Sequence, residues 1–382
     1  KPYLAAMQFV DVIGQNALST RLRDGVLSGR IAHAQLFEGP NGSGGLALAR
    51  AYAQYLHCTD RTKEDSCGVC ASCVAHKKVQ HPDLHWTFPF FKKDGSGKSI
   101  SEPFQIAWRE LMLESEYIGL DDWLSKIGAD KKQLFISVDE ALEVNRKLGL
   151  KSFHGSYKVL ILWLPETMRI DTANKFLKLI EEPTDKTVII FVSQSADKLL
   201  PTILSRLQRV HVPRLSDSEA AHGISAKTGL SEELAQSFAH ITDGNISAAI
   251  RMSSSGVETP DLELFSSWMR ACWSRDGEAF MTGANDFASP GRESQKRFLT
   301  YALHLVRQCI IGNYGADNLV RLTKGEQAFV SKFSRFIHHK NVVDLSSLIE
   351  EAYTDISGNV NAKVVFFDLS VRVHMLLRKE SQ

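Results

Sequence analysis

Residues 34–47 have the form of a phosphate-binding loop whose charge-handling residues are replaced. A working loop reads GxxxxGK[ST] between a strand and a helix: backbone N–H groups wrap the phosphates, the lysine reaches the β- and γ-phosphates, and the hydroxyl holds Mg²⁺. Here Gly39 and Gly44 keep this frame, whereas Gly45 stands in place of the lysine and Leu46 in place of the serine or threonine. The pattern predicts the shape of a nucleotide-binding loop without ATP hydrolysis.

A second nucleotide element is degraded as well. In ATPases of this kind an apolar strand ends in Asp-Glu, which position the Mg²⁺ shell and polarise the attacking water. The strand-like run 158–163 ends instead in Trp163 and Leu164, and Glu166 follows two residues later. We therefore expect a degenerate site at Gly39, Asn41, Gly42, Gly44, Gly45, Leu46, Trp163 and Leu164. The alternative, from the loop alone, is a Gly-rich turn with no nucleotide ancestry.

The first half of the chain alternates between strand and helix patterns. Apolar runs of strand length occupy 35–38, 133–138, 158–163 and 187–193, and apolar residues at helical spacing occupy 15–27, 46–56, 139–149 and 170–181. Strands that alternate with helices predict an α/β domain with a parallel sheet.

The second half reads as helical. Short helices are expected over 213–255, a linker near Ser253–Gly256 with Pro260 beyond it, and then a bundle of about five helices at 262–273, 296–311, 326–338, 343–354 and 360–377. Residues 1–6 look like the remainder of an expression tag ahead of Met7. The expected domains are 7–212, 213–255 and 256–382.

Composition excludes few functions. Lys and Arg total 45 against 44 for Asp and Glu, so the net charge indicates neither a nucleic-acid nor a membrane partner, although a local basic face remains possible. No apolar run approaches the roughly 20 residues of a membrane span, and no signal peptide is evident. A cytoplasmic protein without a membrane partner is the expectation.

Four cysteines form a metal-binding pattern. Cys58, Cys67, Cys70 and Cys73 have the spacing C-x8-C-x2-C-x2-C, which in a cytosolic chain favours a metal over disulfides. Four thiolates satisfy a tetrahedral, structural Zn²⁺, so we expect a zinc module over 58–76. The alternative is four unligated thiols. Cys272 and Cys309 lie in apolar helical settings and are expected in the core.

Other residues have more ordinary interpretations. The aromatic run Trp86–Phe91 suits base stacking or a hydrophobic packing insert, and we favour packing. His81, His85 and His154 look isolated and are expected in loops or in the core, and Lys92, Lys93 and Lys98 in a solvated loop. No nucleophile with a general base is legible.

The stretch 174–207 is the most specific part of the chain. Asn174-Lys-Phe-Leu-Lys-Leu-Ile-Glu-Glu-Pro183 precedes the apolar run 187–193, and Thr202-Ile-Leu-Ser205-Arg206 follows it. Together with Phe9-x-x-x-Ile-Gly-Gln15 and the degenerate loop, this arrangement over residues 8–212 resembles the clamp-loader subfamily of AAA+ proteins. Among these, degraded nucleotide motifs beside an intact Ser-Arg pair are typical of the delta-prime subunits of bacterial DNA polymerase III.

The resemblance implies roles for particular residues. Arg206, with Ser205, would reach the ATP of a neighbouring subunit as an arginine finger, acting in trans; the alternative is a surface ion pair. The family's cysteine after this arginine is Leu207 here. The sensor position falls at Ser193 or Gln194, and Ser247 stands where an ATPase lid would offer an arginine. The zinc module also occurs at this place in the family.

The resemblance also implies a fold and an assembly: an AAA+ domain with an inserted zinc knuckle, a small helical lid, and an all-helical collar at 256–382. Its expected function is a non-hydrolysing scaffold of the clamp loader, which places the sliding clamp on primed DNA. Its expected partners are gamma/tau-like ATPase subunits and a delta-like clamp-opening subunit in a hetero-pentamer, with Zn²⁺ bound and no turnover of ATP or Mg²⁺.

Three other interpretations remain. The chain could be a divergent AAA+ ATPase that hydrolyses ATP itself. It could hold a nucleotide or anion on the N–H groups of residues 41–46 without hydrolysis. The weakest is a self-standing zinc DNA-binding protein, since one knuckle on a neutral chain has little electrostatic footprint.

Overall fold

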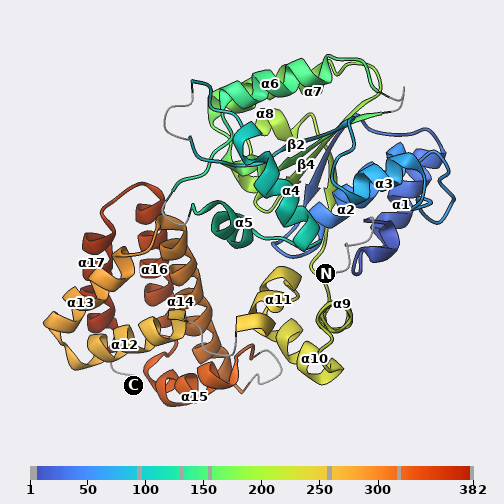
Figure 1. Ribbon diagram of the computed structural model, residues 1–382. Helices are drawn as coiled ribbons and strands as arrows, with labels where there is room; N and C mark the ends of the chain where they lie inside the picture. Colours follow the sequence, from blue (N-terminus) through green and yellow to red (C-terminus); the bar gives the residue numbers. More distant parts are fainter. Residues whose placement is uncertain are drawn as a thin grey trace. The chain divides into compact units, whose positions relative to one another are not determined.

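The computed structural model describes residues 7–92, 97–129, 132–153, 157–255, 260–315 and 320–378. Residues 1–6, Lys93 and His154, which were assigned above to a tag, a loop and a loop or core position, lie outside these ranges. The chain forms two compact units (Figure 1). One joins 1–129 to 134–251, and the other joins 130–133 to 252–382.

The first unit is built on a parallel sheet of five strands. Their order across the sheet is β2 (Leu84–Thr87), β3 (Lys158–Trp163), β4 (Thr187–Ser193), β1 (Ala34–Glu38) and β5 (Gln208–His211). Every neighbouring pair is parallel. The predicted α/β class with a parallel sheet is therefore confirmed.

Helices cover both faces of this sheet, which explains why β3 and β4 are buried at every position. Alternate residues such as Leu36 and Leu160 pack with α6 (Val138–Leu148), α7 (Ile170–Glu181) and α8 (Pro201–Leu204). The intervening residues face α2 (Gly45–His57), where the rings of Phe37 and Tyr52 lie 6.2 Å apart. β1 thereby leads directly into the glycine loop and α2.

Two strand predictions need correction. The predicted strand 133–138 is wrong, because Phe135 and Ile136 form only isolated bridges and the Ser137 hydroxyl accepts from the N–H of Glu140 to start α6. The short edge strands β2 and β5 were missed. In β5 only Val210 of Gln-Arg-Val-His is buried, so its sequence carries little strand signal.

The remaining helices of the first unit lie around this frame. They are α1 (Asn16–Leu27), α3 (Ala71–Lys77), α4 (Gln105–Glu114), α5 (Leu120–Ile127), α9 (Asp217–Thr228), α10 (Glu232–Ile241) and α11 (Ile246–Ser255).

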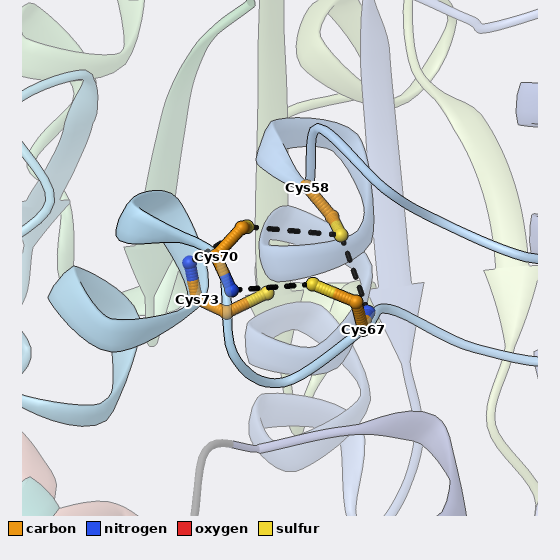
Figure 2. A group of neighbouring side chains, drawn as sticks. All are labelled: Cys58, Cys67, Cys70 and Cys73. Carbon is orange, nitrogen blue, oxygen red and sulfur yellow. Dashed lines mark hydrogen bonds between the residues drawn. The ribbon is translucent and has the colours of Figure 1, made fainter.

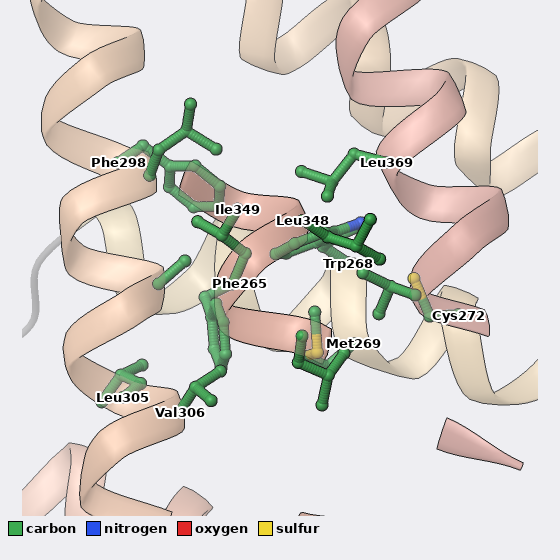
Figure 3. Packing of buried hydrophobic residues seen from close by; sticks show 14 of the residues in the cluster. Phe265, Trp268, Met269, Cys272, Phe298, Leu305, Val306, Leu348, Ile349 and Leu369 are labelled. Atoms are coloured by element: carbon green, nitrogen blue, oxygen red, sulfur yellow. The ribbon is translucent and has the colours of Figure 1, made fainter. Parts of the chain in front are cut away.

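The second unit is entirely helical in its described part. Its helices are α12 (Pro260–Ser274), α13 (Gly277–Ala288), α14 (Arg292–Asn313), α15 (Lys324–Phe333), α16 (Val342–Ser357) and α17 (Ala362–Leu377). They share one aromatic-rich core, in which Phe265, Trp268 and Phe298 pack together (Figure 3). The Trp268 indole N–H donates to the Ser370 hydroxyl at 2.9 Å, so the ring is buried without an unsatisfied donor.

The helix α13 was not predicted, because its two glycines and an Asn-Asp pair weaken the helical pattern. The predicted helix 326–338 ends earlier, at Phe333, and a 3₁₀ turn at Ser334–Phe336 follows it. Among the described helices, none is long and apolar enough to cross a membrane.

Truncation of the sheet core should be costly. Leu160 is fully buried in β3, so Leu160→Ala is expected to lower the free energy of unfolding by about 2–5 kcal/mol, through reduced burial and a residual cavity. Chemical denaturation would measure it. Leu142→Ala, on the exposed side of α6 at 52% exposure, is the control and should change stability by less than about 0.5 kcal/mol. Equal effects of the two changes would contradict this packing.

Candidate functional site

The glycine loop lies between β1 and α2 and is closed by the chain itself. Gly42 and Gly44 have φ of +80° and +92°, a conformation that favours glycine. A Cβ at Gly42 would collide with the side chain of Asn245, which precedes α11, and a Cβ at Gly44 would lie 3.2 Å from the Tyr117 ring. Side chains from the 213–255 region and from the 85–130 insert therefore lie directly against the loop.

Side-chain amides hold this loop in place. The Gln15 amide donates to the carbonyl of Ser43 at 3.0 Å and to that of Pro213 at 2.7 Å. The Gln194 amide donates to the side-chain carbonyl oxygen of Asn41 at 3.2 Å. The loop is thus tied to the N-terminal segment, to the end of β4 and to the start of the 213–255 region by neutral groups.

Trp163 takes the place of the expected carboxylate and fills it. It ends β3, is 1% exposed, and lies 5.2 Å from Trp108 between ring centroids. Trp108 in turn contacts Phe88 and Trp123 from the insert. The packing interpretation of the aromatic run agrees with the burial of Phe88 and Phe90, at 0% and 1% exposure.

The space left beside the loop is small. The cavity bordered by residues 39–47, Tyr117, Trp163 and Gln194 measures about 30 Å³. At roughly 10–15 Å³ for each water, it accommodates two or three water molecules, whereas sites for drug-sized ligands and cofactors measure about 300–1,000 Å³. The space beside the loop is thus far smaller than such sites.

Glu166, two residues beyond the expected carboxylate positions, is fully engaged in hydrogen bonds to the end of β4. Its two oxygens accept from the Ser193 hydroxyl at 2.9 Å and from the N–H of Gln194 at 3.0 Å, the two residues predicted for the sensor position. Burial raises the pKa of Glu166, against the lowering effect of these hydrogen bonds. Both oxygens therefore serve to hold the end of β4.

Ion pairs that the sequence analysis missed fasten the 213–255 region to the insert. Arg251 on α11 pairs with Asp121 at 3.3 Å and Asp122 at 2.9 Å, and Lys227 on α9 pairs with the buried carboxylate of Glu116. Ser247, predicted to stand in place of a lid arginine, donates to the Asn245 side chain at 3.0 Å. No sequence signal joins these residues, because the pairs are more than 100 positions apart.

Arg206 lies at the surface, just after α8. Its Nε donates to the Glu181 carboxylate at 2.5 Å, and its Nη1 donates to the carbonyl of Thr202 at 2.9 Å and to the Ser205 hydroxyl at 3.3 Å. The Nη2 group has no hydrogen-bond partner within the described residues. The side chain is 38% exposed, so one edge of the guanidinium is fixed by the chain while another faces outward.

The four predicted metal ligands converge on one point (Figure 2). Cys58 ends α2, Cys70 caps α3 and Cys73 lies in its first turn, while Cys67 sits before a turn made by Gly68 at φ +71°. All four sulfurs lie within 4.8 Å of one another, and the Sγ atoms of Cys58 and Cys70 are 4.0 Å apart. Tetrahedral Zn–S bonds of about 2.3 Å place sulfurs about 3.8 Å apart, so the donor set fits Zn²⁺.

The thiols are not equivalent before a metal binds. Burial raises the pKa of Cys58 and Cys73. Burial also acts to raise the pKa of Cys70, but N–H groups of Cys73 and Thr59 outweigh it and lower the value to about 6. Because Zn²⁺ binds thiolates, its binding must release protons from the buried thiols.

Three histidines beside this module form a buried cluster. His57 Nδ1 lies 2.8 Å from His76 Nε2, and the rings of His57 and His81 stack at 4.0 Å. His57 Nε2 donates to the carbonyl of Tyr157, which leaves its Nδ1 as the acceptor. Burial lowers the pKa of His57 to about 3 and that of His76 well below its usual value. The expectation that His81 is isolated is wrong; it is buried, stacks on His57 and hydrogen-bonds to the Ser72 hydroxyl.

Comparison with known proteins identifies the class. A sequence model of the family described as "DNA polymerase III, delta subunit" matches residues 14–216, more than half of the chain. The first unit is accordingly an AAA+-type domain of the kind found in DNA polymerase III clamp-loader subunits. The chain belongs to the DNA polymerase III, delta subunit family, and the family-level prediction is confirmed.

Curated relatives match the same part of the chain. The DNA polymerase III subunit tau of Bacillus subtilis is 26% identical over 59% of this chain and 32% of its own length. The gamma/tau subunit of Mycobacterium tuberculosis is 30% identical over 52% of this chain and 27% of its own length. The match thus spans about a third or less of these relatives.

Solved structures are more distantly similar. A gamma subunit-related protein of DNA polymerase III from Thermotoga maritima is 17% identical, with a TM-score of 0.38 over 95% of this chain and all of that one. The RuvB Holliday junction branch migration motor of the same organism covers 65% of this chain at 13% identity, with a TM-score of 0.38.

The filled site leads to a prediction about nucleotide. Because Lys and the Mg²⁺-binding hydroxyl are missing and about 30 Å³ remains, ATP with Mg²⁺ at about 1 mM should not raise the melting temperature of the isolated chain measurably. Thermal denaturation with and without the nucleotide measures this. A concentration-dependent rise in melting temperature, or ATP turnover by the isolated chain, would contradict it.

The cysteine module leads to a prediction about metal. Freshly purified protein should contain about one Zn²⁺ per chain, and Cys70→Ser should lose it and melt at a lower temperature, since structural zinc stabilises the fold. Zinc should also dissociate as the pH is lowered, because protons compete for the thiolates. Metal analysis and calorimetry measure both, with Cys309→Ala, outside the module, retaining the metal. Zinc-free wild-type protein would refute the site.

Proposed function

We propose that this chain is a delta-prime-like subunit of the clamp loader, which hydrolyses no ATP itself and presents Arg206 to the ATP site of a neighbouring subunit. The observation that carries the proposal is a contrast within one domain. The chain's own site lacks the lysine, the hydroxyl and both carboxylates and is filled by Trp163, whereas Arg206 is partly exposed, and its Nη2 has no partner among the described residues.

The chemistry of arginine supports this role. A guanidinium is permanently charged, and its fork of donors matches phosphate oxygens. Supplied in trans, such a finger stabilises charge in the transition state of phosphoryl transfer. Glu181 and the Thr202 carbonyl occupy Nε and Nη1, so the side chain is oriented before a partner arrives, which lowers the entropy cost of binding.

The neutral contacts around the loop support a scaffold. Gln15, Gln194, Asn245 and Trp163 occupy the positions around which an ATPase would bind its nucleotide, so the relation between the loop and the 213–255 region is set by protein contacts. We infer that this region is a lid held in one state, and that the neighbour's nucleotide, not its own, governs the assembly.

The helical unit supports an oligomerisation role for residues 256–382. Along α17, Val364, Phe367 and Met375 are 62%, 37% and 65% exposed and recur at helical spacing. We assign this apolar stripe to the contact between the collar and the gamma/tau-like and delta-like subunits. Through that complex the chain would act on the sliding clamp and primed DNA.

The alternative is a gamma/tau-like subunit that turns over ATP itself, as the identity of the curated relatives would favour. Against it stand Gly45 and Leu46 at the loop and the hydrogen-bonded Glu166, whose oxygens are both in use. The two candidates differ in whether the isolated chain hydrolyses ATP.

The deciding experiment is DNA- and clamp-stimulated ATP hydrolysis by the reconstituted complex. Arg206→Ala should fold and assemble normally but lose a large part of turnover, since trans arginine fingers contribute about 10³–10⁵ in rate in GTPases. Arg209→Ala is the matched control: it is an exposed arginine three residues away, paired with Glu38, and should retain full turnover.

Two results would count against the proposal. If the Arg206→Ala complex hydrolyses ATP and loads clamps at the wild-type rate, Arg206 is a surface ion pair and only the scaffold role survives. If the wild-type chain alone hydrolyses ATP, the chain is a divergent ATPase.

A further inference from the structure

We propose that the helical unit carries a binding surface for single-stranded nucleic acid, centred on Trp273. We call the residues Trp273, Arg275, Arg335, Phe336, Lys340 and Arg378 the Trp273 surface. The inference is independent of the role of Arg206, because it involves only residues of the helical unit.

The aromatic part of this surface is a tilted pair of rings, of which one is exposed. Trp273, in the last turn of α12, is 43% exposed. Its ring centroid lies 4.2 Å from that of Phe336, and the Arg335 guanidinium lies 4.8 Å from the Phe336 centroid. The chain has six tryptophans, and within the described residues Trp273 is the exposed one. An indole fixed at the surface by a second ring offers a face on which a base can stack.

Hydrogen bonds between chain segments make this platform rigid. Two carbonyls at the end of α12 accept hydrogen bonds from the C-terminal part of the chain. The carbonyl of Cys272 accepts from the His374 ring on α17 at 2.7 Å, and that of Trp273 accepts from the Arg378 guanidinium, just after α17, at 3.4 Å. Asn341, which is fully buried, donates to the carbonyls of Phe336 and Leu376. The ends of α12 and α17 and the loop at 337–341 are therefore held together, which lowers the ordering cost when a ligand binds.

The charged part of the surface is a set of cations without acidic partners among the described residues. Arg275, Arg335, Lys340 and Arg378 are exposed. No ion pair involves any of these four within the described part of the chain, whereas Arg251, Arg297 and Arg372 elsewhere are paired with carboxylates. The nearest acidic side chain in sequence, Asp276, is occupied in capping α13 through the N–H groups of Glu278 and Ala279. The chain as a whole has a net charge of only +1, so this surface is more positive than the rest of the chain.

The exposed ring and the cations beside it together indicate which kind of ligand binds. Arginine and lysine that lack acidic partners neutralise phosphates, and an exposed aromatic ring next to them stacks a base, which only a single strand presents face-on. An acidic peptide would satisfy the cations equally well, but it has no ring to place on Trp273 unless its sequence supplies one. Trp273 therefore distinguishes the two ligands, and it favours the nucleic acid.

The test is binding of fluorescein-labelled dT20 to the full chain, followed by anisotropy over a range of salt concentrations. Trp273→Ala should weaken dT20 binding about tenfold, as expected for the loss of one stacked base, while Trp273→Phe should retain most of the affinity. Arg335→Gln and Lys340→Gln should each lower the slope of log affinity against log salt by about 0.7, the change expected when one phosphate is no longer neutralised. Lys363→Gln, an exposed lysine at the far end of α17, is the charge control and should leave both quantities unchanged.

A polyglutamate peptide of about 20 residues, measured in parallel, separates nucleic acid from acidic peptide, because only dT20 offers bases to stack on the indole. The proposal holds if dT20 binds more tightly than polyglutamate and Trp273→Ala weakens dT20 alone. It is overturned if both ligands bind equally and Trp273→Ala changes neither, or if dT20 shows no binding at about 50 mM salt, where phosphate contacts are strong. If thermal melting shows that Trp273→Ala is unfolded, the Trp273→Phe, Arg335→Gln and Lys340→Gln series decides between these outcomes.

Discussion

One aromatic contact links the sheet of the first unit to the insert: a buried indole lies at the end of β3, where the sequence pattern of an ATPase would place a carboxylate. Trp163 ends β3 with a large neutral side chain and packs on Trp108 of the insert. A carboxylate at this buried place would need a cation or several donors to compensate for its lost hydration. The indole needs only apolar neighbours, and the insert supplies them in Phe88, Trp108 and Trp123. The filled site and the aromatic insert are thus two parts of one packing solution.

Other contacts become intelligible from that starting point. With no phosphate to bind, the loop is held by Gln15 and Gln194, and the 213–255 region is drawn against it by Asn245 and by the Arg251 pairs with Asp121 and Asp122. A domain whose parts are joined by its own side chains gains rigidity without ligand. That rigidity suits a subunit whose proposed work is to hold Arg206 toward a neighbour.

The zinc module and the histidine cluster extend the same unit in a different way. The four cysteines connect the end of α2 to α3, and His57, adjacent to Cys58, connects α2 to His76 and to the carbonyl of Tyr157 before β3. A closed four-sulfur site contributes to folding and not to catalysis. The cysteines lie at the opposite end of α2 from the glycine loop, so this end of the helix is held by imidazoles and is where the proposed Zn²⁺ would bind, while the other end is held by amides.

Local patterns were sufficient for much of this protein. Glycine spacing indicated the loop, cysteine spacing the metal ligands, and the Ser205–Arg206 motif a candidate finger, because each of these signals is carried by residues close together in the chain. Strong apolar runs predicted β1, β3 and β4, whereas the polar edge strand β5 and the Gly-containing α13 left too weak a pattern. The strand predicted at 133–138 was wrong because Ser137 caps a helix there.

The tertiary structure alone decided what fills the degenerate site and how the distant parts meet. The contacts between Trp163 and Trp108, between Lys227 and Glu116, and between Arg251 and Asp122 join positions separated by roughly 55 to 130 residues. The same holds for the Trp273 surface, where residues near 273, 336 and 378 come together. The sequence by itself determined most kinds of element and the motifs, since these depend on local spacing. The tertiary structure determined the cavity, the ion pairs and the tilted aromatic pair, since these depend on which non-local surfaces pack.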